Sequence, residues 1–145
     1  SETNAIIKNN LRNWISHYKM LNDVVDIQDA KIVNFSVDFH VITDKSFNTD
    51  QVMYDCLESL KKYFSETFYI GEPLYKTYIF DNLNKVDGVL SVKKVILRNE
   101  STAGYSRNYM NFDKEISRDG TYIKAPKNVI FELKYPDLDI KGTAK

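Results

Sequence analysis

The alternation of apolar and polar residues is most regular between residues 31 and 43. Val33, Phe35, Val37, Phe39 and Val41 alternate there with polar residues. A period of two, made of β-branched and aromatic side chains, predicts a β-strand with one buried face. That face needs an apolar cover, and the segments on both sides of the strand predict amphipathic helices.

Residues 4–21 predict an N-terminal helix, because apolar side chains recur every three or four positions. The stripe consists of Ile7, Leu11, Trp14, Tyr18 and Leu21. A stripe of this kind usually packs on its own domain. It can also pack on a neighbouring subunit, since Trp and Tyr are enriched at the cores of interfaces. We therefore treat Leu11, Trp14 and Tyr18 as candidate interface residues.

A second helix is predicted to follow the 31–43 strand. Asn48 suits its N-cap with Gln51 as the capping-box partner, and Phe47 and Val52 have the spacing of a hydrophobic staple. The apolar face of this helix contains Val52, Met53, Cys56, Leu57, Leu60, Tyr63 and Phe64. We expect it to cover the Val33–Val41 face of the strand.

A third helix is predicted from Pro73 to about Lys85, because proline suits the first helical position. Its expected inner face contains Leu74, Tyr78, Ile79, Leu83 and Val86. After a turn at residues 86–88, a strand is predicted from Val89 to Arg98. Its alternation is imperfect, and a bulge near Lys93–Lys94 or burial on both faces explains this equally well. If this strand is parallel to the first, the crossover between them should be right-handed.

Residues 99–119 predict a long polar loop with a short strand near residues 109–112. Long loops in compact domains are often functional, so Tyr105 and Tyr109 are candidate contact residues. Residues 118–121 predict a turn, Tyr122–Ile123 a brief strand, and Val129–Tyr135 a final strand. The tail after Pro136 is expected to be extended and loosely held.

Together these elements predict a single α+β domain over residues 1–145. We expect a small mixed sheet with helices packed on one face, with a ferredoxin-like βαβ-type core and a preceding N-terminal amphipathic helix. Residues 1–30 hold the helix and a connector, 31–98 a βααβ core, and 99–145 the loop and C-terminal strands. Because the chain starts with Ser1, we interpret it as a fragment of a longer polypeptide.

Charge and composition narrow the choice of partner. The 20 basic and 20 acidic residues cancel, whereas a surface for nucleic acid or anionic lipid needs a basic excess. No apolar run reaches the roughly 18 residues of a membrane helix. The sequence therefore predicts neither a nucleic-acid partner nor a membrane partner.

No set of catalytic, cofactor-binding or metal-binding residues is recognisable. The two histidines, His17 and His40, lack further ligands at metal-site spacing. Glycine-rich phosphate loops and nucleophile elbows are missing from the sequence, and Cys56 belongs to a buried helix face. We therefore predict a protein that is not an enzyme and has no cofactor. An alternative is a small ferredoxin-like module that binds a ligand or nucleic acid through Tyr105, Arg107 and Tyr109, because aromatic rings beside a basic residue can stack bases.

One block of the sequence resembles a known family. Residues 70–97, IGEPLYKTYIFDNLNKVDGVLSVKKVIL, contain the run Val86-Asp87-Gly88-Val89 followed by Val92, which is similar to the signature of the baseplate J-like family. The opening LRNWISHYKMLNDVVDIQDAKIVNFSVDF and the ending FELKYPDLDIKG resemble the large baseplate wedge proteins of T-even-type contractile-tailed bacteriophages. The chain would correspond to a C-terminal part of such a protein.

This resemblance implies a structural role. In that family, copies associate with one another, as a homodimer or higher oligomer, and with other baseplate wedge proteins to form the ring of the baseplate. The expected location is the tail baseplate of the virion, assembled in the host cytoplasm. The family motif marks fold positions such as Gly88, so it assigns no contact residue.

Overall fold

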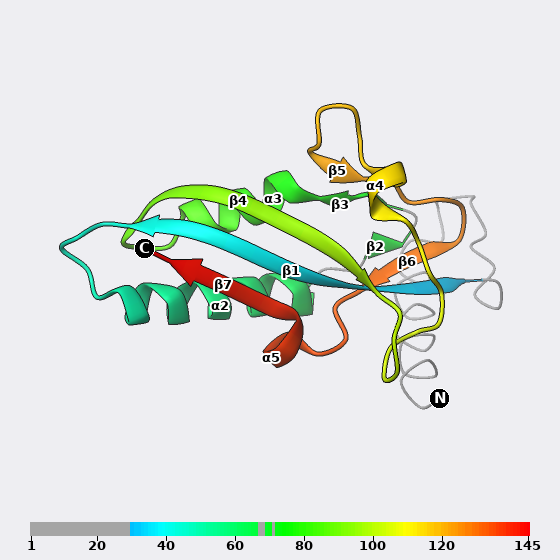
Figure 1. The fold of residues 1–145 in the computed structure, drawn as a ribbon, viewed down its shortest axis with the longest axis horizontal. Coiled ribbons are helices and arrows are strands. Elements are labelled where there is room, and N and C mark those ends of the chain that lie inside the picture. Colours follow the sequence, from blue (N-terminus) through cyan, green and yellow to red (C-terminus); the bar gives the residue numbers. More distant parts are fainter. Residues whose placement is uncertain (1–29, 67–68, 71) are drawn as a thin grey trace.

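The computed structural model describes residues 30–66, 69–70 and 72–145 (Figure 1). The described chain forms a five-stranded mixed sheet on the long strand β1 (Lys31–Thr43). β4 (Val89–Glu100) runs antiparallel along one side of β1. β6 (Val129–Glu132) and β7 (Ile140–Ala144) run parallel along the other side. β2 (Tyr69–Ile70) extends the sheet beyond β6. The N-terminal helix predicted over residues 4–21 lies outside the described residues.

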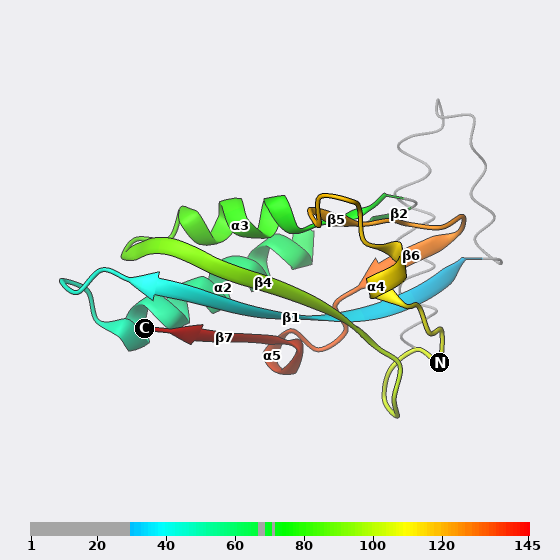
Figure 2. The same ribbon diagram turned by 45° about the horizontal axis from the view of Figure 1, so that its top comes forward.

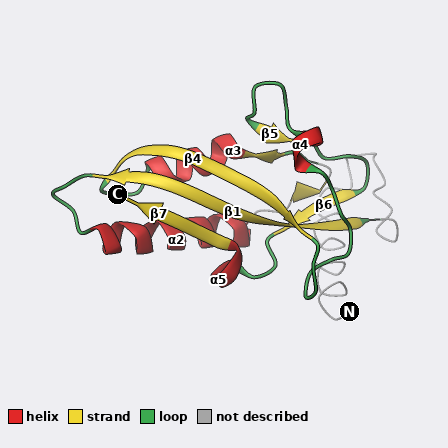
Figure 3. Cartoon of the chain, in the orientation of Figure 1, coloured by secondary structure: helices red, strands yellow, loops and turns green. Residues whose placement is uncertain are grey.

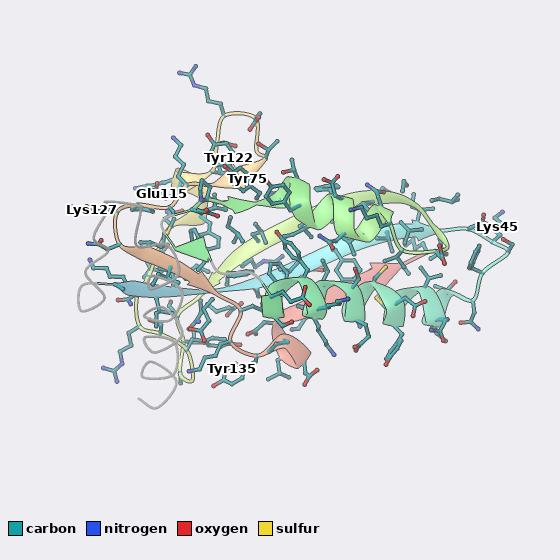
Figure 4. The ribbon with its side chains drawn as sticks, turned by 180° about the vertical axis from the view of Figure 1, so that it is seen from behind. Lys45, Tyr75, Glu115, Tyr122, Lys127 and Tyr135 are labelled. Carbon is teal, nitrogen blue, oxygen red and sulfur yellow. The ribbon has the colours of Figure 1, made fainter. Side chains whose placement is uncertain are left out.

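Two helices cover one face of this sheet, as expected. α2 (Thr49–Glu66) and α3 (Lys76–Asn84) lie on the same side of the strands in both the front and the rear view (Figures 2 and 4). The predicted apolar face of β1 is buried: Val33, Phe35, Val37, Phe39 and Val41 are at most 2% exposed. Val52, Cys56 and Leu60 of α2 and Ile79 and Leu83 of α3 complete the core. The mixed α+β architecture is therefore confirmed.

Local signals in the sequence placed the start of α2 correctly. Asn48 Oδ1 accepts a hydrogen bond from Gln51 N at 3.1 Å, which is the predicted N-cap. The Gln51 side chain donates to Asp55 instead of returning to the Asn48 backbone, so only half of the capping box forms. Phe47 and Val52 both lie against Gly88, which has a φ of 91°. A Cβ atom there would lie 2.7 Å from Val52. The turn before β4 therefore needs glycine both because φ is positive and because no side chain has room.

The third helix starts later than predicted. Leu74–Tyr75 forms β3, which pairs with β5 (Tyr122–Ile123), and α3 begins only at Lys76. The pairing takes precedence over proline's preference for a first helical turn, because it buries Leu74 completely. Tyr78, expected on the inner face, is 49% exposed.

The bulge in β4 is confirmed and the βαβ-type core is not. His40 lies opposite Lys94 and Val41 opposite Val92, so Lys93 is the extra residue of a bulge. β4 is antiparallel to β1, whereas a βαβ unit needs parallel strands. The right-handed crossover expected for parallel strands therefore does not arise here.

The C-terminal part differs most from expectation. No strand forms at residues 109–112; instead α4 (Phe112–Glu115) begins there, capped by Asn111 Oδ1 at 3.1 Å from Asp113 N. β6 ends at Glu132, not at Tyr135. The tail expected to be loose forms the short helix α5 (Pro136–Asp139) and then β7, which is part of the central sheet. The predicted turn at residues 118–121 is confirmed, with Gly120 at a φ of 73°.

Cys56 should be unreactive in the folded protein. Its side chain is fully buried, and burial raises the pKa of its thiol to about 11. At pH 8 only about one thiol in a thousand is then the reactive thiolate. We expect a disulfide reagent to label Cys56 only after the chain is unfolded in guanidinium. Full labelling of native protein within seconds would contradict its burial.

Candidate functional site

One face of the sheet is covered by neither α2 nor α3, and the short helix α5 borders it at one end. We call it the open face and define it by the β1 residues that alternate with the buried ones and by their cross-strand partners in β4 and β7. These residues are Ser36, Asp38, His40 and Ile42 of β1, Lys94, Ile96 and Arg98 of β4, and Lys141 and Thr143 of β7. Each is exposed or half-buried. The open face is therefore a broad surface of mixed charge.

Polar and charged contacts order the side chains in the middle of this face. Asp38 Oδ2 lies 3.4 Å from Arg98 Nη1, and Asp38 Oδ1 lies 3.9 Å from His40 Nε2. Ser36 Oγ donates to Glu100 Oε1 at 2.8 Å. Pairs this exposed contribute at most about 1 kcal/mol to stability. Their effect is to orient charged groups on the surface.

A pocket of about 390 Å³ lies at one end of the open face. Its floor includes Ser36 and Arg98 of the sheet, and Tyr105 and Leu138 come from the loop after β4 and from α5. The charged residues around it are Asp38, Glu100 and Asp139, against Arg98 and Lys141. With three carboxylates and two cations, the pocket has a formal charge of −1 and favours a positive group.

The wall of this pocket is fixed by a set of contacts that we call the clasp. The Tyr105 hydroxyl donates to Asp139 Oδ1, and the Tyr135 backbone N–H donates to Asp139 Oδ2 at 3.1 Å. This carboxylate raises the pKa of the Tyr105 phenol well above its usual value. The Tyr135 hydroxyl and Lys134 Nζ both donate to the Gly104 carbonyl, at 2.9 and 2.6 Å. The clasp ties the loop after β4, shown in Figure 3, to the segment that leads into β7.

The structure separates the candidate residues named from the sequence. Tyr105 is half-buried, its ring packs edge-on against Tyr135, and its hydroxyl is engaged by Asp139. Tyr109 is 72% exposed and borders a different depression beside Met110 and Phe112. Leu11, Trp14 and Tyr18 lie outside the described residues. Stacking of bases between Tyr105 and Tyr109 therefore has little geometric support.

Sequence reasoning missed most of the open face. The even positions of β1 were visible as a polar set, but their partners Arg98 and Lys141 come from β4 and β7. The strand β7 was not recognised, and the bulge at Lys93 reverses the parity of β4. No local signal identifies either partner.

Neither a metal site nor a membrane-spanning helix occurs in the described residues. Within residues 30–66, 69–70 and 72–145, no group of three or more His, Cys, Asp or Glu is arranged to hold a metal ion. No helix in the described part of the chain is long and apolar enough to cross a membrane.

Comparison with known proteins adds no relative. No protein-family model matches this sequence, and no curated protein matches it at a significant level. The resemblance to the baseplate J-like family therefore rests on the sequence motifs alone.

The clasp can be tested by removing one hydroxyl. Tyr105→Phe should lower the free energy of unfolding by roughly 1.5–3 kcal/mol, because the buried Asp139 carboxylate loses a charge-assisted hydrogen bond. Chemical denaturation measures this directly. Tyr109→Phe is the matched control and should have no effect, since that side chain is exposed. Equal stability of the two variants would contradict the clasp.

Proposed function

We propose that this chain is a structural domain of a phage tail baseplate wedge. It self-associates, as a homodimer or higher oligomer, and packs with other wedge proteins to form the baseplate ring. It acts in the virion, after assembly in the host cytoplasm, and performs no catalysis. The observation that carries the proposal is the open face, a sheet surface with ordered charges and exposed apolar side chains at both ends.

The position of the family motif also supports the proposal. Residues 86–89 form the turn between α3 and β4, and Gly88 lies there at positive φ against Val52 and Phe47. The motif glycine thus occupies a position at which the fold requires glycine. This agrees with a motif that marks fold positions and not contacts.

One observation, the pocket on the open face, supports an alternative function. The pocket beside Arg98 and Lys141 also has Tyr105 in its wall, which suits a small ferredoxin-like module that binds a ligand, and its net negative charge favours a cationic ligand over single-stranded nucleic acid. Any binding of nucleic acid should weaken steeply with salt. If no oligonucleotide binds the chain at low salt, the nucleic-acid form of this alternative is wrong.

Sedimentation of this chain over a range of concentrations tests the first proposal. We expect a dimer or larger species at micromolar concentrations. A strictly monomeric species at high micromolar concentration would count against self-association. Trp14→Ala and Tyr18→Ala then test whether the N-terminal segment forms the contact. If oligomers survive both changes, the interface lies elsewhere on the chain.

A further inference from the structure

The two ends of the open face differ in charge and in shape. Glu100 of β4 borders the pocket of formal charge −1 at one end. Lys94 lies six residues earlier on the same strand, about 20 Å away, and it is exposed. Neither residue has a salt bridge among the described residues. One end is therefore a negatively charged recess, and the other carries a protruding cation.

Exposed apolar side chains occur at the same two ends. Leu138 of α5 is 64% exposed at the rim of the pocket. Leu90, an extra residue in the register of β4, is 63% exposed, and Ile42 on β1 is 37% exposed. Exposed apolar side chains that form a patch beside polar groups mark contact sites more often than isolated exposed side chains do.

We propose that the open face binds the open face of a second copy about a two-fold axis that lies between the sheets and crosses the strands. The strands of the two copies then run antiparallel, and Lys94 of each copy enters the pocket of the other beside Glu100. The contact occurs twice, as two-fold symmetry requires. This inference rests on the self-association in the proposed function, and it specifies the surface and the orientation.

Charge favours this axis over one that runs along β1. An axis along β1, the middle strand of the open face, would place that strand against itself, with Asp38 facing Asp38. Like charges juxtaposed in an interface cost several kcal/mol. The crossing axis instead brings the negative end of each copy to the basic end of the other. It also brings the Leu138 end of one copy towards the Leu90 and Ile42 end of the other.

Charge reversal and charge exchange provide the test. Lys94→Glu and Glu100→Lys should each weaken dimerisation roughly tenfold or more, because each creates two like-charge contacts. The double variant should restore the dissociation constant to near the wild-type value, since both pairs return with exchanged signs. Sedimentation equilibrium measures all three. Lys124→Glu, an exposed reversal away from the open face, should leave dimerisation unchanged.

Folding effects are separated from contact effects by a milder change. Glu100→Lys also loses the acceptor for Ser36 Oγ, whereas Glu100→Gln keeps an acceptor and removes only the charge. Glu100→Gln should therefore weaken dimerisation less than Glu100→Lys, with an unchanged unfolding midpoint.

The remaining outcomes are distinct. If the single variants associate as tightly as the wild type, the open face is not the contact between copies, and the proposed function still stands. A double variant as weak as the single variants would overturn the pairing of Glu100 with Lys94. A wild-type chain that is monomeric throughout would overturn both the inference and the self-association on which it rests.

Discussion

Replacing Gly142 by alanine should destabilise the protein by about 3 kcal/mol, near the upper end of the usual cost of overpacking a core. A Cβ atom at this position would overlap the ring of Phe39, which is fully buried in the middle of β1. The positive-φ residues of the described chain do not include Gly142, so the cost arises from lack of space and not from backbone strain. Denaturant unfolding measures the loss. Hydrogen exchange should show that protection is lost first in β7.

Two further variants show whether the ring is the cause. Thr143→Ala changes the neighbouring residue, whose side chain lies on the open face, and should cost less than about 0.5 kcal/mol. Phe39→Leu shortens the opposing side chain, so Gly142→Ala should cost clearly less in that background than in the wild type. Additive effects of the two changes would show that the clash with the Phe39 ring is not the cause.

Replacing Asn34 by alanine should cost about 2–4 kcal/mol, because it leaves buried polar groups without partners. Asn34 is 1% exposed although it lies on the polar side of β1. Its Oδ1 accepts from Ser106 N at 2.6 Å, and its Nδ2 donates to the Glu132 carbonyl at 3.3 Å. One side chain therefore connects β1 to both the loop after β4 and β6. Urea unfolding measures the loss, and hydrogen exchange should increase first in the loop around Ser106.

Ser36→Ala is the control for that variant. Ser36 is two residues further along β1 and donates to a half-exposed carboxylate, Glu100. Water can replace that bond, so the change should cost less than about 1 kcal/mol. If Asn34→Ala were no more destabilising than Ser36→Ala, the loop would not depend on the buried amide.

The Asn34 contacts explain why the conformation of the loop after β4 could not be predicted from the sequence. Residues 101–111 have no periodic pattern, yet the loop is held by side chains of asparagine and serine. Asn108 Nδ2 donates to the Ile32 carbonyl at 2.9 Å, and Asn99 Oδ1 accepts from Met110 N at 3.2 Å. Polar residues in a sequence indicate a loop, but not which buried backbone groups their side chains reach. For this reason Tyr105 was expected on a contact surface, and it is instead part of the clasp.

The family resemblance and the structure contribute separately to the proposed function. Residues 86–89 and the flanking segments resemble baseplate wedge proteins, and the proposed contact between copies of this chain rests on the open face. Sedimentation of the wild-type chain tests association by itself, whereas the charge-exchange experiment needs a chain that associates and then tests the open face. A wild-type dimer with unaffected single variants would therefore overturn the open face and leave self-association standing.

The sequence by itself determined those parts of the protein that depend on neighbours along the chain. The buried face of β1, the N-cap of α2 at Asn48 and the turn at Gly88 were all predicted correctly. Periodicity records which side chains face the core, and capping and turn residues act within a few positions of themselves. The imperfect alternation in β4 allowed two interpretations, a bulge or burial on both faces, and the register against β1 shows the bulge.

Only the tertiary structure decided how the strands pair and what the open face presents. The tail 140–144 has almost no apolar pattern, but Gly142 fits the Phe39 ring and Ile140 is buried, so it becomes a strand of the central sheet. Such fits depend on shape between residues far apart in the chain, and no local period encodes them. The same pairing brings Arg98 and Lys141 to either side of Asp38 on β1. The candidate interaction surface is therefore a product of strand register.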